Sequence, residues 1–250
     1  MRVNGYTIYN GPSLLDGSPI VALITGFAIP TANPKMGKEP LQSWILRSDV
    51  TPIESVKTGA DAAICGACPH RGHIEDGRNL GRSCYVQYHF GVQNTWLAWK
   101  RGNYPERARP IDIADLGFAR MVRIGSYGDP AAVPFWVWRT VASGAAWTMG
   151  YTHAWRTCDE KLKQLCMASV ESEAERQEAK AAGWRTFRVR HAHEPVGDYE
   201  IVCPASTEAG KVATCEECRA CGGLRAKAKA DVAIVAHGGR RSEANFARRQ

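Results

Sequence analysis

The chain alternates short apolar runs with segments rich in polar residues, glycine and proline. Residues 20–26 form a nearly continuous, largely β-branched run that ends in glycine, which is typical of a strand buried on both faces. Residues 41–47 follow as a second strand. The same pattern predicts further strands at 62–65, 83–89, 121–126, 146–151, 166–170 and 184–190.

Segments with helical signals separate most of these strands. They predict helices at 51–57, 92–100, 111–120, 131–143, 154–165 and 172–182. Ser172 and Glu175 have the spacing of a capping box, and Gly183 follows as a stop signal. Asp129, directly before Pro130, has the position of an N-cap.

The alternation of strands and helices predicts an α/β fold with a parallel sheet. For a chain of 250 residues, we expect a closed (β/α)8 barrel of the TIM type, with an open doubly wound sheet as the alternative. Two further strand-like runs, at 199–202 and 232–236, either supply the eighth strand or cover the barrel. We expect a single domain, 1–250, with a cysteine-rich segment at 203–223 packed on the barrel.

The composition excludes several classes of protein. Hydrophobic residues make up 44% of the chain and charged residues 23%, as in an ordinary globular protein. No window approaches the roughly 18 consecutive apolar residues of a membrane-spanning helix, and the first residues lack the apolar core of a secretory signal. We therefore expect a cytoplasmic protein with no membrane partner.

Four cysteines towards the C-terminus have the spacing of a metal site. Cys215, Cys218 and Cys221 are separated by two residues each, and Cys203 lies eleven intervening residues upstream. Thiolates bind soft metals, and successive two-residue gaps occur in ferredoxin-type [4Fe-4S] sites. We predict a [4Fe-4S] cluster on these thiols, with zinc as the alternative. The glycine pair at 222–223 would allow the backbone to approach the cluster closely.

A second group of thiols consists of Cys65, Cys68 and Cys84. Three thiolates leave one coordination position, which His70 or His73 could fill in a zinc site. The group could also join the four cysteines in one composite site, or contain only free thiols.

The remaining two cysteines, Cys158 and Cys166, have no partner at ligand spacing, so we expect them in the core. The total of nine cysteines is odd, and their clustering in C-x2-C units favours metal binding over a disulfide framework.

Polar residues stand where the predicted strands end, which is where function gathers in such barrels. They are Asp49, His89, Ser126, Asp129, His153, Glu171, Arg190 and His191. Of these, Asp49, His89, Asp129, His153 and Glu171 are the candidate catalytic residues, suited to proton transfer. Alternatively, such residues only cap helices.

The net charge of +7 comes partly from a basic C-terminal tail. Its residues are Arg225, Lys227, Lys229, Arg240, Arg241, Arg248 and Arg249. A tail of this kind could contact nucleic acid or simply form a solvated surface. The sequence contains no GxxxxGK[ST], HExxH or GxSxG motif.

An ordered set of short motifs resembles a known family. The motifs are Cys65-x2-Cys68-Pro69, Cys84-Tyr85, Arg123 to Asp129, Trp147 to Thr152, and Cys203-Pro204 with Thr214-Cys215-x2-Cys218-x2-Cys221. In this order they resemble the phage-encoded gene-product-88-like proteins of mycobacteriophages and their relatives, whose pattern has radical SAM-like barrel features.

The resemblance implies a TIM-barrel-like phage protein that carries an iron–sulfur cluster in the host cytoplasm, and it makes S-adenosylmethionine (SAM) a candidate ligand. The C-x3-C-x2-C spacing by which radical SAM enzymes leave one iron free is absent. Cys65, Cys68 and Cys84 would reach such an arrangement only by a different loop path.

Three hypotheses about function follow. The first is an iron–sulfur protein with redox or cluster-dependent chemistry, acting with a redox partner or a small-molecule substrate. The second is a zinc-stabilised protein that binds nucleic acid through the basic tail. The third is an enzyme that uses the polar residues at the strand ends.

Overall fold

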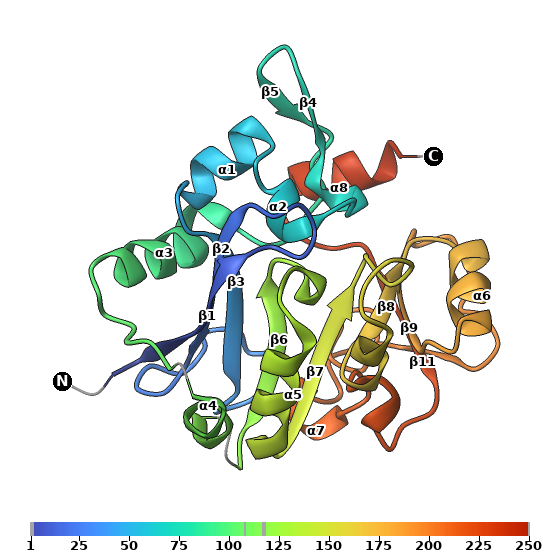
Figure 1. Ribbon diagram of the computed structural model, residues 1–250. Helices are drawn as coiled ribbons and strands as arrows, with labels where there is room; N and C mark the ends of the chain where they lie inside the picture. The colour runs from blue at the N-terminus through green and yellow to red at the C-terminus, as the bar shows by residue number, and fades with distance from the viewer. Residues whose placement is uncertain (1–2, 108, 117–118, 250) are drawn as a thin grey trace.

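The computed structural model describes residues 3–107, 109–116 and 119–249. Within these residues, nine strands form one sheet in the order β1-β2-β3-β6-β7-β8-β9-β11-β10 (Figure 1). The strands are β1 (Gly5–Pro12), β2 (Pro19–Thr25), β3 (Leu41–Arg47), β6 (Met121–Tyr127), β7 (Trp147–Thr152), β8 (Met167–Val170), β9 (Thr186–Arg190), β10 (Glu200–Val202) and β11 (Asp231–Val235). The first three strands are antiparallel, and all later neighbours are parallel.

The α/β class is confirmed, but the sheet is not closed into the expected eight-stranded barrel. In the described part of the chain, β1 and β10 are its two edges. Both late runs belong to the sheet, because β11 lies between β9 and β10. The N-terminal strand β1 was not predicted, since Gly5–Pro12 mixes polar residues with tyrosines and lacks a clear apolar run.

Two expected strands are wrong, and both lie near the three-thiol group. Residues 62–65 form the helical turn α2 (Ala62–Cys65), because the carbonyl of Asp61 accepts hydrogen bonds from the amides of Ile64 and Cys65. Residues 83–87 have no regular structure, and a π-helix follows at Tyr88–Val92. A four-residue apolar run does not distinguish a strand from a helical turn.

The helices lie between the strands much as expected. They are α1 (Pro52–Thr58), α3 (Gln93–Lys100), α4 (Pro110–Leu116), α5 (Phe135–Gly144), α6 (Glu173–Ala181), α7 (Cys215–Cys218) and α8 (Arg240–Ala247). Short 3-10 turns occur at Pro69–Arg71, Pro130–Ala132, Glu160–Gln164 and Gly223–Arg225, and a hairpin joins β4 (His73–Glu75) to β5 (Arg78–Leu80). None of the described helices is long and apolar enough to cross a membrane.

The helix predictions differ from the structure in detail. The segment expected to be helical at 154–165 forms only the turn Glu160–Gln164, and the one at 131–143 is split by Pro134 into a 3-10 turn and α5. Of the helix expected at 111–120, residues 117–118 lie outside the described residues. Ser172 and Asp129 act as N-caps as predicted, accepting hydrogen bonds from the amides of Glu175 and Ala131.

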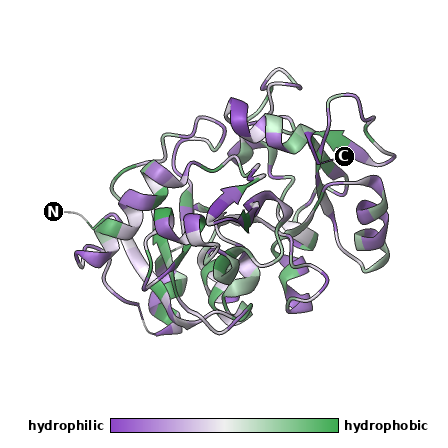
Figure 2. Cartoon of the chain, turned by 90° about the horizontal axis from the view of Figure 1, so that it is seen from above, coloured by the Kyte–Doolittle hydropathy of each residue, from purple (hydrophilic) through white to green (hydrophobic). Residues whose placement is uncertain are grey.

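The two faces of the sheet are covered by different material. On one face, Val122 and Ile124 of β6 pack with Val137 and Trp138 of α5. On the other, Met121, Met149 and Met167 pack with Met36 and Cys221. Alternate residues of a strand point to opposite faces, so the methionines lie on one face of the sheet and the valine and isoleucine residues lie on the other. We call the second surface the cysteine face. Figure 2 shows apolar residues concentrated in the strands.

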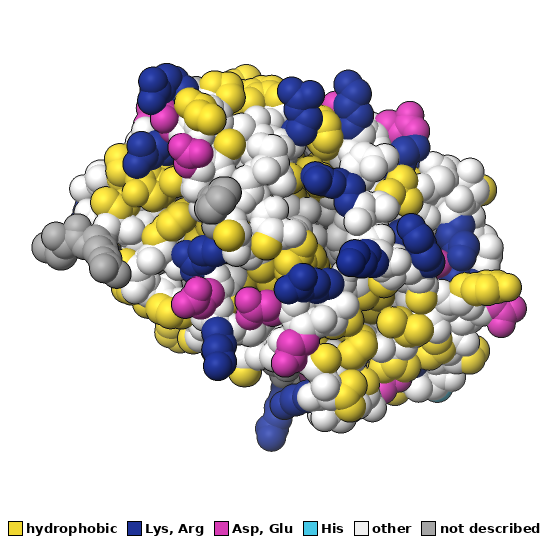
Figure 3. Space-filling view, turned by 90° about the horizontal axis from the view of Figure 1, so that it is seen from below, with side chains coloured by type: hydrophobic (Ala, Val, Ile, Leu, Met, Phe, Trp, Pro, Cys, Tyr) yellow, Lys and Arg dark blue, Asp and Glu magenta, His cyan; other side chains and the backbone are white. Residues whose placement is uncertain are grey.

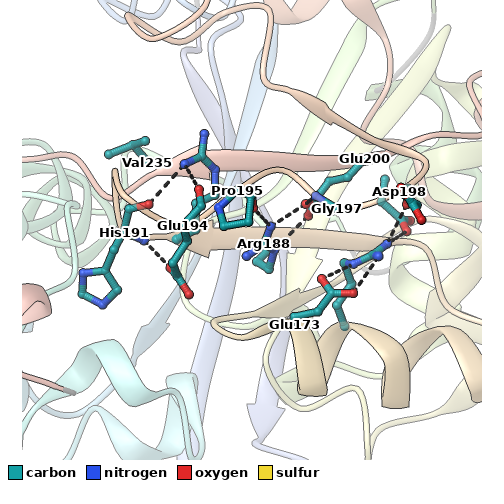
Figure 4. A network of polar contacts seen from close by, with 12 residues as sticks. Glu173, Arg188, His191, Glu194, Pro195, Gly197, Asp198, Glu200 and Val235 are labelled. Carbon is teal, nitrogen blue, oxygen red and sulfur yellow. Dashed lines mark hydrogen bonds and ion pairs between the residues drawn. The ribbon is translucent and has the colours of Figure 1, made fainter.

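A buried ionic network fixes the edge of the sheet beside α6 (Figure 4). Arg188 of β9 donates to Glu200 of β10 at 2.6 Å, and the two side chains are 2% and 0% exposed. Arg188 also donates to the carbonyl of Pro195 at 2.8 Å, and Glu200 accepts from the amide of Gly197 at 2.9 Å. Hydrogen bonds on all sides are what make a buried pair tolerable.

Removing one partner of this pair should therefore be costly. Arg188→Met is expected to lower the free energy of unfolding by about 3–5 kcal/mol, because it leaves the carboxylate of Glu200 buried without a cation. The double variant Arg188→Met/Glu200→Leu should recover more than half of the loss. Urea denaturation measures both, with the exposed Arg109→Met as a control that changes little. Equal stabilities of the single and double variants would contradict the prediction.

Candidate functional site

One cavity of about 210 Å³ borders both cysteine groups. Its walls include Cys65, Cys68 and Cys84 of one group and Cys203 and Cys215 of the other. Residues from β6, β7, β8, β9, β11 and α8 also line it, together with loop residues such as Met36. The cavity therefore lies on the cysteine face, near the ends of the parallel strands.

The four-thiol group, Cys203, Cys215, Cys218 and Cys221, surrounds a smaller cavity of about 20 Å³. Cys203 directly follows β10, and Cys215 begins α7. A capping box at Thr214 and Glu217 starts this short helix, and the amide of Cys215 donates to the carbonyl of Lys35 at 2.7 Å. Arg219 ends it in the left-handed region at φ 54°, which turns the chain back towards Cys221.

Hydrogen bonds and close backbone packing hold the segment after α7 against the rest of the fold. Arg185 donates to the carbonyls of Ala220 at 2.7 Å and Gly223 at 3.0 Å. A Cβ atom at Gly222 would lie 2.8 Å from the carbonyl oxygen of Thr148, and one at Gly223 would lie 2.5 Å from that of Lys163. The two glycines thus allow close packing on the rest of the fold, which differs from the approach to a cluster expected for them.

Burial and mutual repulsion disfavour free thiolates in this group. Burial, together with the neighbouring thiols, raises the pKa of Cys215 to about 11. Burial raises the pKa of Cys221 to about 12, although a hydrogen bond with Tyr151 acts in the opposite direction. Arg123 and Lys35 lower the pKa of Cys215. The thiols of this group therefore ionise to thiolates only where a nearby positive charge compensates them.

Arg123 supplies such a charge from the middle of β6. The residue is 8% exposed, and its guanidinium donates to Tyr85 Oη at 2.5 Å and to Met36 Sδ at 3.8 Å. Its Nε has no hydrogen-bond partner, and none of the described carboxylates forms an ion pair with it. A buried cation without a carboxylate is costly unless another anion compensates it. The thiol of Cys215 is among the groups that interact with its charge.

A buried carboxylate, that of Asp61, lies near the three-thiol group of Cys65, Cys68 and Cys84. Asp61 is fully buried and accepts from Arg71 at 2.9 Å and from Arg82 at 3.1 Å. The carbonyl of His70 accepts from the amides of Ser83 and Cys84, which brings the two loops together. Burial and the nearby Cys68 raise the pKa of Cys65 well above its usual range.

The thiols of each group interact electrostatically mainly with thiols of the same group. The thiols that most affect Cys65 are Cys68 and Cys84, both of its own group. The thiols that most affect Cys221 are Cys203, Cys215 and Cys218, again of its own group. This pattern does not favour one composite site.

A third cluster combines two histidines and a carboxylate. Oε1 of Glu171, just after β8, lies 3.1 Å from Nε2 of His70 and 2.9 Å from Nε2 of His153, just after β7. Among the described residues, these ligand atoms are the set of three that lie within 4.8 Å of one another. We call it the His–His–Glu triad.

Glu171 changes the pKa of both histidines of the triad, and both histidines change the pKa of Glu171. Burial opposes ionisation of Glu171, but hydrogen bonds from His153 and His70 outweigh it and hold its pKa well below its usual range. Burial lowers the pKa of His70. Burial acts the same way on His153, but Cys68 and Glu171 overcome it and raise its pKa well above the usual value.

The other polar residues predicted at strand ends differ in their location and contacts. Asp129 accepts from Thr152 Oγ1 at 2.7 Å and from the amide of His153 at 2.8 Å, so it positions the triad. Asp49 is 46% exposed and pairs with Arg47. His89 lies outside the cavity against the ring of Tyr88.

The structure also locates the remaining histidine, cysteine and arginine residues that the sequence singled out. His73 is 67% exposed on the β4–β5 hairpin, away from the thiols whose fourth ligand it could have been. Cys166 is buried in the core with Cys158 packed against it, as expected. Of the strand-end residues, Arg190 donates to the carbonyl of Glu194 at 2.7 Å. The rings of His191 and Phe246 lie 4.5 Å apart between centroids, with their planes tilted by 40°.

Sequence reasoning missed Arg123 as a site residue and His70 as a member of the triad. A single arginine in the strand Met121–Tyr127 gives no signal of its surroundings. His70 was considered only as a zinc ligand, because its contact with Glu171 spans 101 residues of sequence.

The basic tail is partly built into the fold. Helix α8 contacts the loop before the π-helix, where Ser242 donates to the carbonyl of Cys84 at 3.3 Å and Asn245 to that of Arg82 at 2.8 Å. Phe246 stacks on His70 at 5.8 Å. Truncation at residue 224 would remove β11 as well, so it cannot test the tail alone. On the face in Figure 3, basic side chains are interspersed with acidic and hydrophobic ones.

Comparisons with protein-family models, with curated proteins and with solved structures found no match for this chain.

The thiol chemistry of the site can be measured on metal-free, reduced protein. At pH 8, a thiol with a pKa of about 11 is only about 0.1% thiolate, against roughly a quarter for an ordinary thiol. Cys215 should therefore react with iodoacetamide about two hundred times more slowly than a free thiol, and faster as the pH rises. Arg123→Met should slow it further, because the cation that favours the thiolate is lost.

Peptide mass spectrometry over time measures these rates. Cys158 is the internal control, since its rate should be the same with and without Arg123. A Cys215 rate that does not change in Arg123→Met would show that the arginine does not stabilise the thiolate.

Proposed function

We propose that this chain is an iron–sulfur protein that holds a [4Fe-4S] cluster on Cys203, Cys215, Cys218 and Cys221 and uses it in redox chemistry at the adjoining cavity. The observation that carries the proposal is the arrangement of four thiols from two separate segments around one small cavity. Three further observations support it.

The first is the spacing of the thiols. Four thiolates on one tetrahedral zinc ion, at about 2.3 Å from the metal, stand about 3.8 Å apart. Within the part of the chain that the structure describes, no three thiols come within 4.8 Å of one another. In a cluster each thiolate binds a different iron, so wider spacing is required. A spacing wider than that of one zinc site is what a cluster requires.

The second is the buried charge of Arg123. A cluster held by four thiolates has a net negative charge, and hydrogen bonds and nearby charges set its reduction potential. Among the described residues, Arg123 has no carboxylate partner and its Nε has no hydrogen-bond partner. Its side chain lines the cavity that Cys203 and Cys215 also border. An anionic cluster would compensate this cation.

The third is the cavity itself. Bound on the four thiols, a [4Fe-4S] cluster would supply one-electron transfer. Cys203 and Cys215 would bring it to the wall of a space of about 210 Å³. His153 and Tyr151 line the same space and could orient a small ligand there. The resemblance to gene-product-88-like phage proteins implies the same kind of cofactor.

Metal content tests the proposal directly. Anaerobically purified protein should be brown, absorb near 400 nm and contain about four irons that depend on the four-thiol group. Cys218→Ser should lose these irons, whereas Cys158→Ser, which changes a thiol outside both groups, should retain them. Cys84→Ser should also retain them, because Cys84 does not line the small cavity that the four thiols surround. Colourless protein with one or more stoichiometric zinc ions would overturn the proposal.

The buried charge of Arg123 should raise the reduction potential of the cluster. Arg123→Met should make the cluster harder to reduce, because a buried positive charge favours the more negative, reduced state. Arg123→Lys keeps the charge and should shift the potential less. A redox titration followed by electron paramagnetic resonance measures the midpoint. A midpoint in Arg123→Met equal to that of the natural protein would show that the arginine does not serve the cluster.

A further inference from the structure

The geometry points to a second kind of metal site: we propose that the His–His–Glu triad binds one divalent transition-metal ion, of the class that includes Fe(II) and Mn(II), at the wall of the cavity. The proposed iron–sulfur cluster does not include any of these three side chains. The inference therefore goes beyond the proposed function and stands or falls independently of it.

The two distances to Glu171 match those between neighbouring ligands of one ion, and the histidine nitrogens lie within 4.8 Å of each other. Metal–nitrogen and metal–oxygen bonds are about 2.1 Å long, so two ligands at a right angle stand about 3.0 Å apart. The observed nitrogen–oxygen distances are 3.1 Å for His70 and 2.9 Å for His153. Two imidazoles and one carboxylate on one side of an ion form the facial triad of non-haem Fe(II) sites, which leaves other positions open.

Three separate parts of the chain build the triad, so it does not follow from local sequence. His70 lies in the turn Pro69–Arg71, His153 follows β7, and Glu171 follows β8. The side chains are only 12%, 20% and 20% exposed. His70 and His153 line the cavity, so open positions on the ion would face a small ligand there.

The surrounding residues orient the ligands as metal sites require. A metal-bound histidine uses its second ring nitrogen for a hydrogen bond that fixes the ring. Nδ1 of His70 lies 2.7 Å from Ser83 Oγ, a hydroxyl that can accept this hydrogen bond. Asp129 holds the backbone of His153, and Glu175 accepts from the amide of Glu171 at 2.9 Å.

The competing explanation is a purely hydrogen-bonded unit in which both histidines donate to Glu171. Mn(II) distinguishes the two, because it favours oxygen and nitrogen ligands over the thiolates nearby. Full-length protein, purified anaerobically with its thiol sites loaded, is titrated with Mn(II). The electron paramagnetic resonance signal of free Mn(II) gives the bound fraction, and pulsed measurements detect nitrogen ligands.

One Mn(II) per chain with imidazole nitrogens bound is the expected result. Glu171→Gln keeps the shape of the side chain and one acceptor oxygen for the two histidines but should weaken binding by more than tenfold, and Ser83→Ala by about tenfold. Asp49→Asn and His73→Gln change residues outside the triad and should have no effect. Thermal melting confirms that each variant is folded.

Three outcomes would overturn the inference: no Mn(II) bound, binding without nitrogen ligands, or binding that Glu171→Gln leaves unchanged. The last would mean adventitious binding at surface carboxylates. Iron content of the four-thiol group is measured in the same samples. Protein that contains no cluster iron but binds Mn(II) at the triad would overturn the proposed function alone. Protein that contains cluster iron but binds no Mn(II) would overturn the metal site alone.

Discussion

An open sheet has two apolar faces to bury, and this constraint determines much of the molecule. Helices such as α5 cover one face in the usual α/β manner. The other face is buried under Met36 and the segment that carries the four thiols. The cysteine-rich segment is therefore part of the core and not a module attached to a finished barrel. Metal binding there would be coupled to the stability of the whole sheet.

The same constraint brings distant chemical groups together. Parallel strands end at one edge, so residues after β7 and β8 meet there although they are separated in sequence. Glu171 contacts His153 in this way, and the loop from α2 adds His70. Because the sheet does not close, the space beside this edge is bordered by both thiol groups. Thiols of both groups and the two histidines of the triad thus share one cavity.

The sequence was most informative where burial on both faces leaves a strong pattern. Strands β2, β3, β6, β7, β8, β9, β10 and β11 were predicted close to their positions, as was the grouping of the four thiols. Residues 62–65 and 83–89 were misassigned because a short apolar run is compatible with several structures.

Long-range contacts were harder to predict. The strand-end rule correctly associated His153 with Glu171, but it also selected Asp49 and His89, since it does not distinguish a strand end at the cavity from one elsewhere. Arg123 carries no local signal, because the groups around it, Met36 and Tyr85, come from other parts of the chain.

Buried arginines also change what the net charge means. Arg123, Arg176, Arg185, Arg188 and Arg190 are all less than 9% exposed. Arg185 fastens the cysteine-rich segment through backbone carbonyls, and Arg188 pairs with Glu200. A guanidinium presents five donors in a fixed planar geometry, which suits loops whose carbonyls have no partner in a sheet. Part of the charge of +7 therefore organises the interior, and it is not available to attract nucleic acid at the surface.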